Sequence, residues 1–296
     1  MVSTGAVEMG QGVNTKMLQI VHDIFGINTE KIRIESTNTL RIANTSPTAA
    51  SAGADLNGKA LEMACNTLRK RLTEVAQRHF DANEVAFRDG NIFSSDKSQQ
   101  ISWEKLVIMA FQQRVALSEH AHYVTPVIHY DKSKEKGHPF AYHVYGAAIL
   151  QVTVDCLKGT YQFDSVRIVH DSGNSMNLTV DNGQIEGGLV QGIGWMTLEE
   201  VVYSKQGKLI SNALSTYKVP DIYAVPKEID IRHLDTIGPD LAIKKSKAVG
   251  EPPLMYGLGA YFAIRKAVKA FNPYAELTID APYTPEKVLM DLYKKH

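Results

Sequence analysis

The sequence predicts an α+β chain of two mixed α/β subdomains, and three observations lead to this fold class. Apolar residues recur every three to four positions in several segments, which is typical of amphipathic helices. Other segments alternate apolar and polar residues, which is typical of strands. The length of 296 residues fits one large or two medium domains. The polar, lysine-rich stretch 125–139 is the expected junction, so we predict subdomains at 1–130 and 131–296.

The first subdomain is expected to begin with a glycine loop and an amphipathic helix. Gly10, Gln11 and Gly12 form the loop. Apolar residues at three-to-four spacing predict a helix over 15–25, which ends at Gly26. The further elements expected here are a strand at 31–35, a hairpin at 83–93 around Asp89-Gly90 and a helix at 103–117.

A long helix is expected to start within residues 45–47, where Ser and Thr precede Pro, and to continue past Leu72. Its first turns hold small side chains, among them Ala49, Ala50 and Ser51. Small side chains leave the backbone N–H groups of a helix N-terminus open to an anion. Close packing against a neighbouring helix would explain the same residues, so both interpretations stay open at this point.

The second subdomain is expected to combine a sheet with two helices. The expected strands are 142–155, 166–171 and 228–231, and the expected helices are 181–196 and 254–271. The first of these helices contains five glycines. Because each interior glycine costs about 1 kcal/mol against alanine, we expect another backbone or a bulky ligand to approach this helix closely.

The motif Gly250-Glu251-Pro252-Pro253 is the most informative short stretch of the chain. Prolines fix φ and are tolerated in the first turn of a helix, so a helix can begin directly after Glu251. A carboxylate placed this rigidly is suited to chemistry. The alternative is an acidic residue that only complements the positive end of a helix dipole.

Composition excludes several classes of function. Lys plus Arg and Asp plus Glu are both 32, which gives no support for a nucleic-acid or membrane-surface partner. Without a signal peptide or a long apolar run, a cytoplasmic location is the default expectation. Cys65 and Cys156 are too few for a [2Fe–2S] centre, which needs four thiolates, and the ten histidines show no zinc-site spacing. Dinucleotide and P-loop fingerprints are also missing.

Six motifs taken in order resemble the xanthine dehydrogenase family of molybdenum hydroxylases, in the C-terminal half of its molybdopterin-binding region. The resemblance covers nearly the whole chain. The motifs are Glu-Met-Gly-Gln-Gly at 8–12, Ser-Thr-Asn-Thr at 36–39, Thr-Ser-Pro-Thr-Ala-Ala-Ser at 45–51, Gly-Gln-Ile-Glu-Gly-Gly-Leu-Val-Gln-Gly at 183–192, Ser-Thr-Tyr-Lys-Val-Pro at 215–220 and Lys-Ala-Val-Gly-Glu-Pro-Pro at 247–253.

The resemblance implies the fold of a molybdenum cofactor-binding domain and a molybdopterin-molybdenum cofactor, with or without an added cytosine nucleotide. The pterin dithiolene holds the molybdenum, so no protein ligand to the metal is expected. The residues that match cofactor contacts of the family are Gly10, Gln11, Gly12, Ala49, Ala50, Ser51 and Gln184. Gly53 stands where relatives often place a serine, which puts one pterin contact in doubt.

The resemblance assigns Glu251 the role of general base. It would take the proton from Mo–OH, whose oxygen attacks an electron-poor carbon while hydride passes to Mo=S. The implied substrate is a small heteroaromatic purine, hypoxanthine or xanthine; an aldehyde or another N-heterocycle is the alternative within the family. A hypothesis of a different class is a non-catalytic cofactor-binding fragment, against which the intact Glu251 argues.

The chain lacks the N-terminal half of the family's molybdopterin region and the iron–sulfur and FAD domains. We therefore expect those parts on other chains or domains, in a hetero-oligomer for which dimerisation is left open. A neutral chain is weakly protected from association, which fits a piece of a larger assembly. The isolated chain would present about half of a cofactor site, and no turnover is expected from it.

Overall fold

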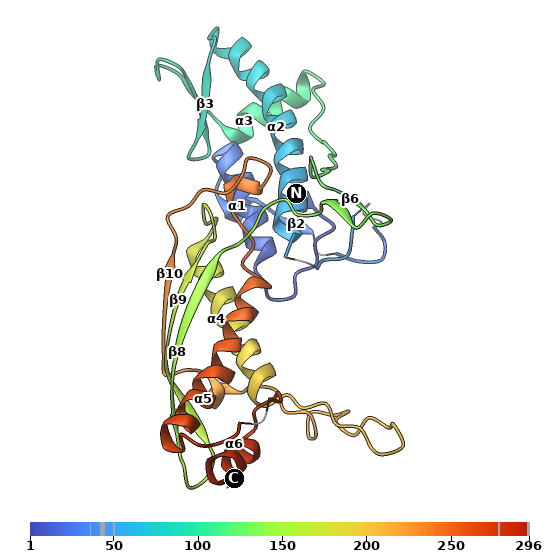
Figure 1. Cartoon of the computed structure of the whole chain (residues 1–296). Coiled ribbons are helices and arrows are strands. Elements are labelled where there is room, and N and C mark those ends of the chain that lie inside the picture. Colours follow the sequence, from blue (N-terminus) through green and yellow to red (C-terminus); the bar gives the residue numbers. More distant parts are fainter. Residues whose placement is uncertain (36, 42–44, 50, 278, 295–296) are drawn as a thin grey trace. The chain divides into compact units, whose positions relative to one another are not determined.

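The computed structural model describes residues 1–35, 37–41, 45–49, 51–277 and 279–294 (Figure 1). The chain divides into two compact units, and the predicted α+β class is confirmed. The first unit comprises 1–141 with 239–246, and the second comprises 142–238 with 247–296. The subdomain boundary at 130/131 stays a prediction, because compactness alone does not define a cofactor-binding subdomain.

The first unit combines α-helices with short sheets. Its helices are α1 (Val13–Phe25), α2 (Gly53–Phe80), α3 (Trp103–Gln112) and the short 3-10 segments η1 (Thr29–Lys31) and η3 (Ile243–Lys245). Its strands are β1 (Val2–Ser3), β2 (Ile34–Glu35), β3 (Val85–Arg88), β4 (Asn91–Ser94), β5 (Gln100–Ser102), β6 (His129–Asp131) and β7 (Lys136–His138). Strands β1 and β2 are parallel, whereas the β3–β4–β5 sheet and the β6–β7 pair are antiparallel.

The core of the first unit lies between α1 and α2. Met17 and Ile20 on α1 and Val75 on α2 are completely buried. The segment 239–246 belongs to this core because Ile243, also fully buried, packs against Gly58 of α2. A residue far along the chain therefore completes the first unit.

Several elements of the first unit differ from expectation. The long helix begins at Gly53 instead of within 45–47, since Ser51 adopts a left-handed backbone with φ of 51° that a right-handed helix cannot contain. The strand expected at 31–35 is reduced to β2, because η1 occupies its first residue. Helix α3 ends earlier than expected, and the junction 125–139 contains the β6–β7 hairpin.

The second unit packs helices on one face of a three-stranded sheet. Its strands, in spatial order, are β10 (Glu228–His233), β9 (Tyr161–His170) and β8 (Gly146–Val154). Its helices are α4 (Leu178–Thr197), the 3-10 segments η2 (Ile222–Ala224) and η4 (Pro252–Gly257), α5 (Leu258–Phe271) and α6 (Pro285–Tyr293). Strand β9 is antiparallel to β8 and parallel to β10.

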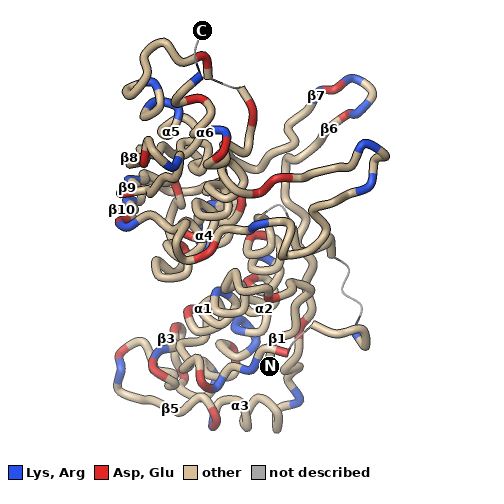
Figure 2. Tube along the Cα trace, turned by 90° about the horizontal axis from the view of Figure 1, so that it is seen from below, with Lys and Arg blue, Asp and Glu red and all other residues tan. Residues whose placement is uncertain are grey.

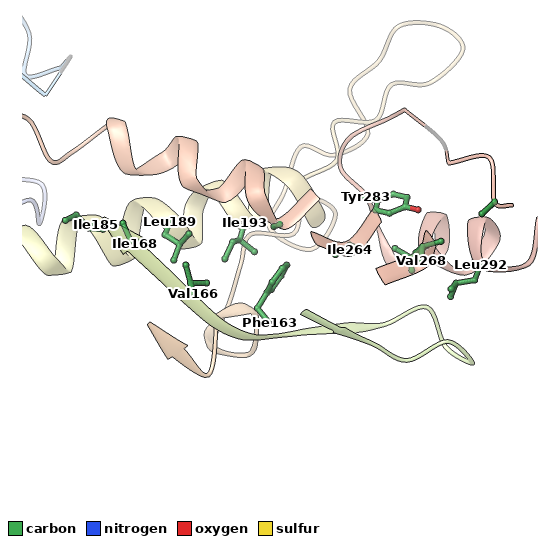
Figure 3. Packing of buried hydrophobic residues seen from close by; sticks show 13 residues of the cluster. Phe163, Val166, Ile168, Ile185, Leu189, Ile193, Ile264, Val268, Tyr283 and Leu292 are labelled. Atoms are coloured by element: carbon green, nitrogen blue, oxygen red, sulfur yellow. The ribbon is translucent and has the colours of Figure 1, made fainter. Parts of the chain in front are cut away.

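The core of the second unit forms where β9 faces α4 and α5 (Figure 3). Val166 and Ile168 point from β9 toward Ile185 and Leu189 of α4, as the predicted helical spacing requires. The predicted strands and the glycine-rich helix are therefore confirmed. One expectation needs correction: the chain after Glu251 first forms the 3-10 turn η4, and the α-helix starts only at Leu258.

Candidate functional site

In the first unit, the strand pair β1–β2 brings two predicted cofactor-binding segments together. Val2 lies opposite Ile34 in parallel register, so the two strands end at the same edge. The glycine loop follows β1, and the segment that carries Thr48 follows β2. The backbone N–H of Val7 donates to the Thr48 hydroxyl at 3.0 Å, which joins the two segments directly.

The glycine loop is held by the carboxylate of Glu8. One oxygen accepts from the N–H groups of Gly10 (2.9 Å) and Gly12 (3.0 Å), and the other accepts from Asn14 (2.9 Å). Burial alone would raise the pKa of Glu8, but these backbone hydrogen bonds outweigh it and leave the pKa lowered. Gly10 and Gly12, with φ of 103° and 76°, supply the backbone conformations that this wrapping requires.

The predicted contact residue Gln11 uses its side chain inside the loop. Its oxygen accepts from Met9 N–H at 2.6 Å, and its amide nitrogen donates to the Val7 carbonyl at 2.7 Å. Ala49 is exposed beside the loop partner Thr48, Ser51 is half-buried, and Ala50 lies outside the described residues. Ala49 and Ser51 precede α2 instead of lying in its first helical turn.

In the second unit, α4 and η4 pack through glycines, as Figure 1 shows for the region where α4 runs beside the chain leading into α5. A Cβ on Gly188 would lie 2.9 Å from Pro253. A Cβ on Gly192 would collide with the Leu254 carbonyl and approach Gly257 to 3.0 Å. Close backbone approach therefore explains glycines in the middle of a helix.

Glu251 is exposed at the start of η4. In the part of the chain that the structure describes, its side chain makes no capping hydrogen bond to the helical turn that follows. The capping alternative therefore loses its main support, because a capping acid would bind those N–H groups. Pro253 behind it is buried, and Leu254 N–H donates to the Glu251 carbonyl at 3.1 Å, so the backbone under the carboxylate is fixed.

Gln184 lies one turn before Gly188 on α4, and Glu251 lies two residues before Pro253, so the α4–η4 contact brings their segments together. The Gln184 side chain is half-buried, and within the described residues it has no hydrogen-bond partner. Its amide can therefore donate and accept toward a ligand, unlike that of Gln11.

A buried polar cluster lies at the end of β9, and no sequence motif indicates it. Asp171 accepts from Lys247 Nζ at 2.5 Å and from Thr236 Oγ1 at 2.5 Å. His170 Nδ1 lies 2.7 Å from the Tyr256 hydroxyl. These partners are 65 to 86 residues apart along the chain, and no local spacing links them, so only the folded chain reveals the cluster.

The pKa values in this cluster follow from burial and pairing. Burial alone would raise the pKa of Asp171, but hydrogen bonds from Lys247 and Thr236 leave it lowered. Burial lowers the pKa of His170, which favours the neutral ring. Burial and then the charge of Asp171 raise the pKa of Tyr256 to about 12. The Tyr256 hydroxyl therefore keeps its proton and can donate it to His170.

Metal-ligand grouping, helix hydropathy and surface charge also bear on the kind of site. Among residues 1–294, outside the gaps given above, no three His, Cys, Asp or Glu side chains are grouped so as to hold a metal ion. The helices of this same part of the chain include none with the length and hydropathy needed to cross a membrane. Figure 2 shows acidic and basic residues intermixed along both units, in keeping with the zero net charge.

Comparison with known proteins identifies the family of this chain. The model of the molybdopterin cofactor-binding domain matches residues 1–226. Xanthine dehydrogenase/oxidase of Mus musculus is 39% identical over 295 residues, covering 97% of this chain and 21% of that protein. Xanthine dehydrogenase 2 of Arabidopsis thaliana is 36% identical over 301 residues, covering 98% of this chain and 21% of that protein. The chain thus spans about a fifth of the length of these relatives.

Solved structures share the fold. Quinoline 2-oxidoreductase from Pseudomonas putida 86 superposes with a TM-score of 0.82 at 24% identity, covering 99% of this chain and 36% of that one. Aldehyde oxidoreductase from Desulfovibrio gigas gives a TM-score of 0.73 at 24% identity, covering 96% and 28%. With fold, ordered motifs and family match in agreement, the resemblance is confirmed: the chain belongs to the molybdopterin cofactor-binding domain family and is similar to that region of the xanthine dehydrogenases.

Proposed function

We propose that this chain supplies the catalytic base and part of the cofactor site of a molybdenum hydroxylase that oxidises a purine such as hypoxanthine or xanthine. The observation that carries the proposal is the Glu251 carboxylate, which is exposed on a fixed turn and is not used to cap the helix behind it. A carboxylate on a rigid backbone is what general base catalysis needs.

The residues of the first unit fit a flat, polar cofactor such as molybdopterin. No described atom lies within 4 Å of where a Cβ of Gly10 would be, so a ring can approach the loop backbone there. In the second unit, the Gln184 amide offers a donor and an acceptor, which match the heteroatoms of a pterin. Within the first unit, Gly12, Ala49, Ala50 and Ser51 are proposed as cofactor contacts, with Gln11 shaping the loop from within. A cytosine nucleotide on the pterin would be detected by mass spectrometry of the released cofactor.

When bound, the molybdenum centre supplies the oxidising power by accepting two electrons from the substrate carbon. The residues of this chain would supply the base and part of the cofactor site. Glu251 takes up the proton released as that carbon gains oxygen, and the α4–η4 packing keeps its backbone in place. Gln184, on the same pair of elements, holds the cofactor.

A purine is the favoured substrate because the relatives that match 97% or more of this chain at 36–39% identity are xanthine dehydrogenases. The solved quinoline and aldehyde oxidoreductases match at 24% identity and share only the fold. Steady-state rates with xanthine, an aliphatic aldehyde and quinoline would separate these substrate classes. A preference of the complete enzyme for the aldehyde would overturn the purine assignment.

Exposed apolar surface supports a larger assembly around this chain. In the second unit, the segment 201–224 exposes Leu214 (82%), Ile222 (76%) and Tyr223 (83%). In the first unit, an open cavity of about 1230 Å³ is lined by apolar side chains such as Leu72 and Trp103. Apolar surface of this kind marks a protein interface. We propose that the remaining molybdopterin-binding polypeptide covers it, and that iron–sulfur and FAD domains complete a cytoplasmic hetero-oligomer.

The test of the base is Glu251→Gln in the complete enzyme. We expect kcat to fall by at least ~10²-fold while the molybdenum content stays unchanged, because only the proton acceptor is lost. Glu228→Gln is the matched control, since Glu228 is an exposed acid on β10 of the same unit. A near-normal rate in the Glu251 variant would contradict the role of base and favour the cofactor-binding fragment. The chain alone, mixed with cofactor and an electron acceptor, is expected to show no purine oxidation.

A further inference from the structure

We propose that the buried ion pair between Asp171 and Lys247 is a positioning device for Glu251, which holds the segment 247–251 against the end of β9. The inference rests on the proposed function, because it explains how the base is kept in place. Both residues lie outside the set that the sequence singled out as catalytic or cofactor-binding.

The ion pair is almost completely shielded from solvent. Lys247 Nζ and Asp171 Oδ2 are 2.5 Å apart, and the two side chains are 12% and 1% exposed. The second oxygen of Asp171 accepts from Thr236 Oγ1 at 2.5 Å and from Gly173 N–H at 3.3 Å. The ring of Tyr145 lies 5.8 Å from the Lys247 ammonium. Both carboxylate oxygens of Asp171 therefore have hydrogen-bond donors, which makes the geometry of the pair well defined.

The ion pair lies at the point where the chain re-enters the second unit. Segment 239–246 belongs to the first unit, and Lys247 is the next residue. Its backbone N–H also donates to the Ser172 carbonyl at 2.8 Å, so side chain and backbone are both fixed beside Asp171. Four residues span at most about 14 Å of extended chain, so a fixed Lys247 limits where Glu251 can lie.

The other side of Glu251 is held by the same strand end. Tyr256, five residues after Glu251, pairs with His170 at 2.7 Å, and His170 precedes Asp171 in the sequence. Adjacent residues at the end of β9 thus hold both flanks of the Glu251 turn. A displacement of about 1 Å at a reacting group costs on the order of 10²-fold in rate. Contacts on both sides of Glu251 would prevent such a displacement of its carboxylate.

A second ion pair of the same composition provides the matched control. Asp164, within β9, accepts from Lys227 Nζ at 2.7 Å and from Thr153 Oγ1 at 2.5 Å. Lys227 is 60% exposed, and neither partner borders the Glu251 turn in the sequence. The two pairs share charge and donor types, with Asp164 within β9 and Asp171 directly after it. They differ in burial and in which segment the lysine belongs to.

Hydrogen exchange in the chain itself gives a test that needs no cofactor. The double variant Asp171→Asn/Lys247→Met removes both charges, so it leaves no unpaired ion in the interior. We expect amide exchange in peptides covering 247–257 to quicken by at least ~10-fold, with peptides of β8 unchanged. The control Asp164→Asn/Lys227→Met should exchange like the parent chain throughout.

The complete enzyme carrying the same variants tests the link to catalysis. For Asp171→Asn/Lys247→Met we expect kcat to fall by at least ~10-fold, with KM for xanthine, molybdenum content and thermal midpoint close to the parent. Lys247→Arg keeps the charge and should restore kcat to within ~3-fold of the parent. Unchanged exchange, or unchanged kcat, in the charge-free double variant overturns the proposal. Failure of the proposed function would show separately, because the enzyme carrying Glu251→Gln would then keep its turnover rate. Amide exchange of 247–257 would still decide whether the ion pair holds this segment.

Discussion

The glycine loop of the first unit and the Glu251 turn of the second both present predicted site residues, but they are held by different means. The loop is wrapped around the exposed carboxylate of Glu8, which accepts from three backbone N–H groups. The turn is packed against α4 by backbone contacts at Gly192 and is preceded by a buried ion pair. One region thus depends on polar contacts in water, and the other depends on the packed interior.

This difference matches the roles that we propose for the two regions. Exposed hydrogen bonds and charges are weakened by solvent and salt, so a loop held by them can adjust when a ligand binds. Packed backbones are not deformable by more than small amounts, so a side chain carried on them keeps its position. The glycine loop is therefore suited to adapt, and the Glu251 turn is suited to hold its side chain in place, as the proposed cofactor and base roles require.

The largest predicted effect is a loss of stability, caused by a substitution in the packed contact between α4 and η4. Gly192→Ala places a methyl group against the Leu254 carbonyl and the Cα of Gly257, which forces α4 and η4 apart. We expect the free energy of unfolding to drop by about 3 kcal/mol, the upper end for overpacking, because backbone cannot move aside as a flexible side chain can. Chemical denaturation of the chain, followed by circular dichroism, measures the loss.

Gly187→Ala in the same helix is the control for that variant. No described atom lies within 4 Å of a Cβ at Gly187, and the position is exposed. An alanine there should raise the free energy of unfolding by about 0.5–1 kcal/mol, since it lowers the backbone entropy of the unfolded chain. Equal stability of the two alanine variants would show that the glycine contacts do not hold the turn.

A smaller effect is expected when the loop loses its charge. Glu8→Gln keeps the shape but weakens the acceptor for the N–H groups of Gly10, Gly12 and Asn14. Charge-assisted hydrogen bonds are worth about 1.5–3 kcal/mol when shielded, and discounting for solvent exposure leaves about 1 kcal/mol. Amide exchange of residues 10–14 should quicken, while exchange of 247–257 should not change. Equal effects on both regions would contradict their independence.

Sequence patterns anticipated the parts of this molecule that local physics determines. Helix α1 ends at Gly26 and the hairpin turns at Asp89-Gly90, because glycine adopts the left-handed backbone that both positions use. The glycines of α4 were expected to mark close backbone approach, and Gly188 and Gly192 confirm it. The chemical roles of Glu251 and Gln184 stay predictions, carried by the resemblance.

The rest depends on contacts between distant parts of the chain. The start of α2 was placed too early because Thr45 and Ser46 before Pro47 are an ordinary start signal, whereas the left-handed backbone of Ser51 delays the helix to Gly53. The pairing of Asp171 with Lys247 spans 76 residues, so no window of sequence contains it. Helix α6 was missed altogether, although Thr284 and Pro285 are an ordinary start signal.

The smallest predicted effect is a pH dependence that belongs to the loop. The pKa of Glu8 is lowered from its ordinary value of 4.5, so its stabilisation of the loop is complete above that value and is lost as pH falls through the folded-state pKa. A protonated Glu8 side chain is uncharged, as the side chain of glutamine is. The difference in unfolding free energy between the parent chain and Glu8→Gln should therefore be largest near pH 7 and shrink as the pH falls below 4.5. Denaturation at pH 7, 5, 4 and 3 measures it, and a difference that stays constant over this range would show that the Glu8 charge does not hold the loop.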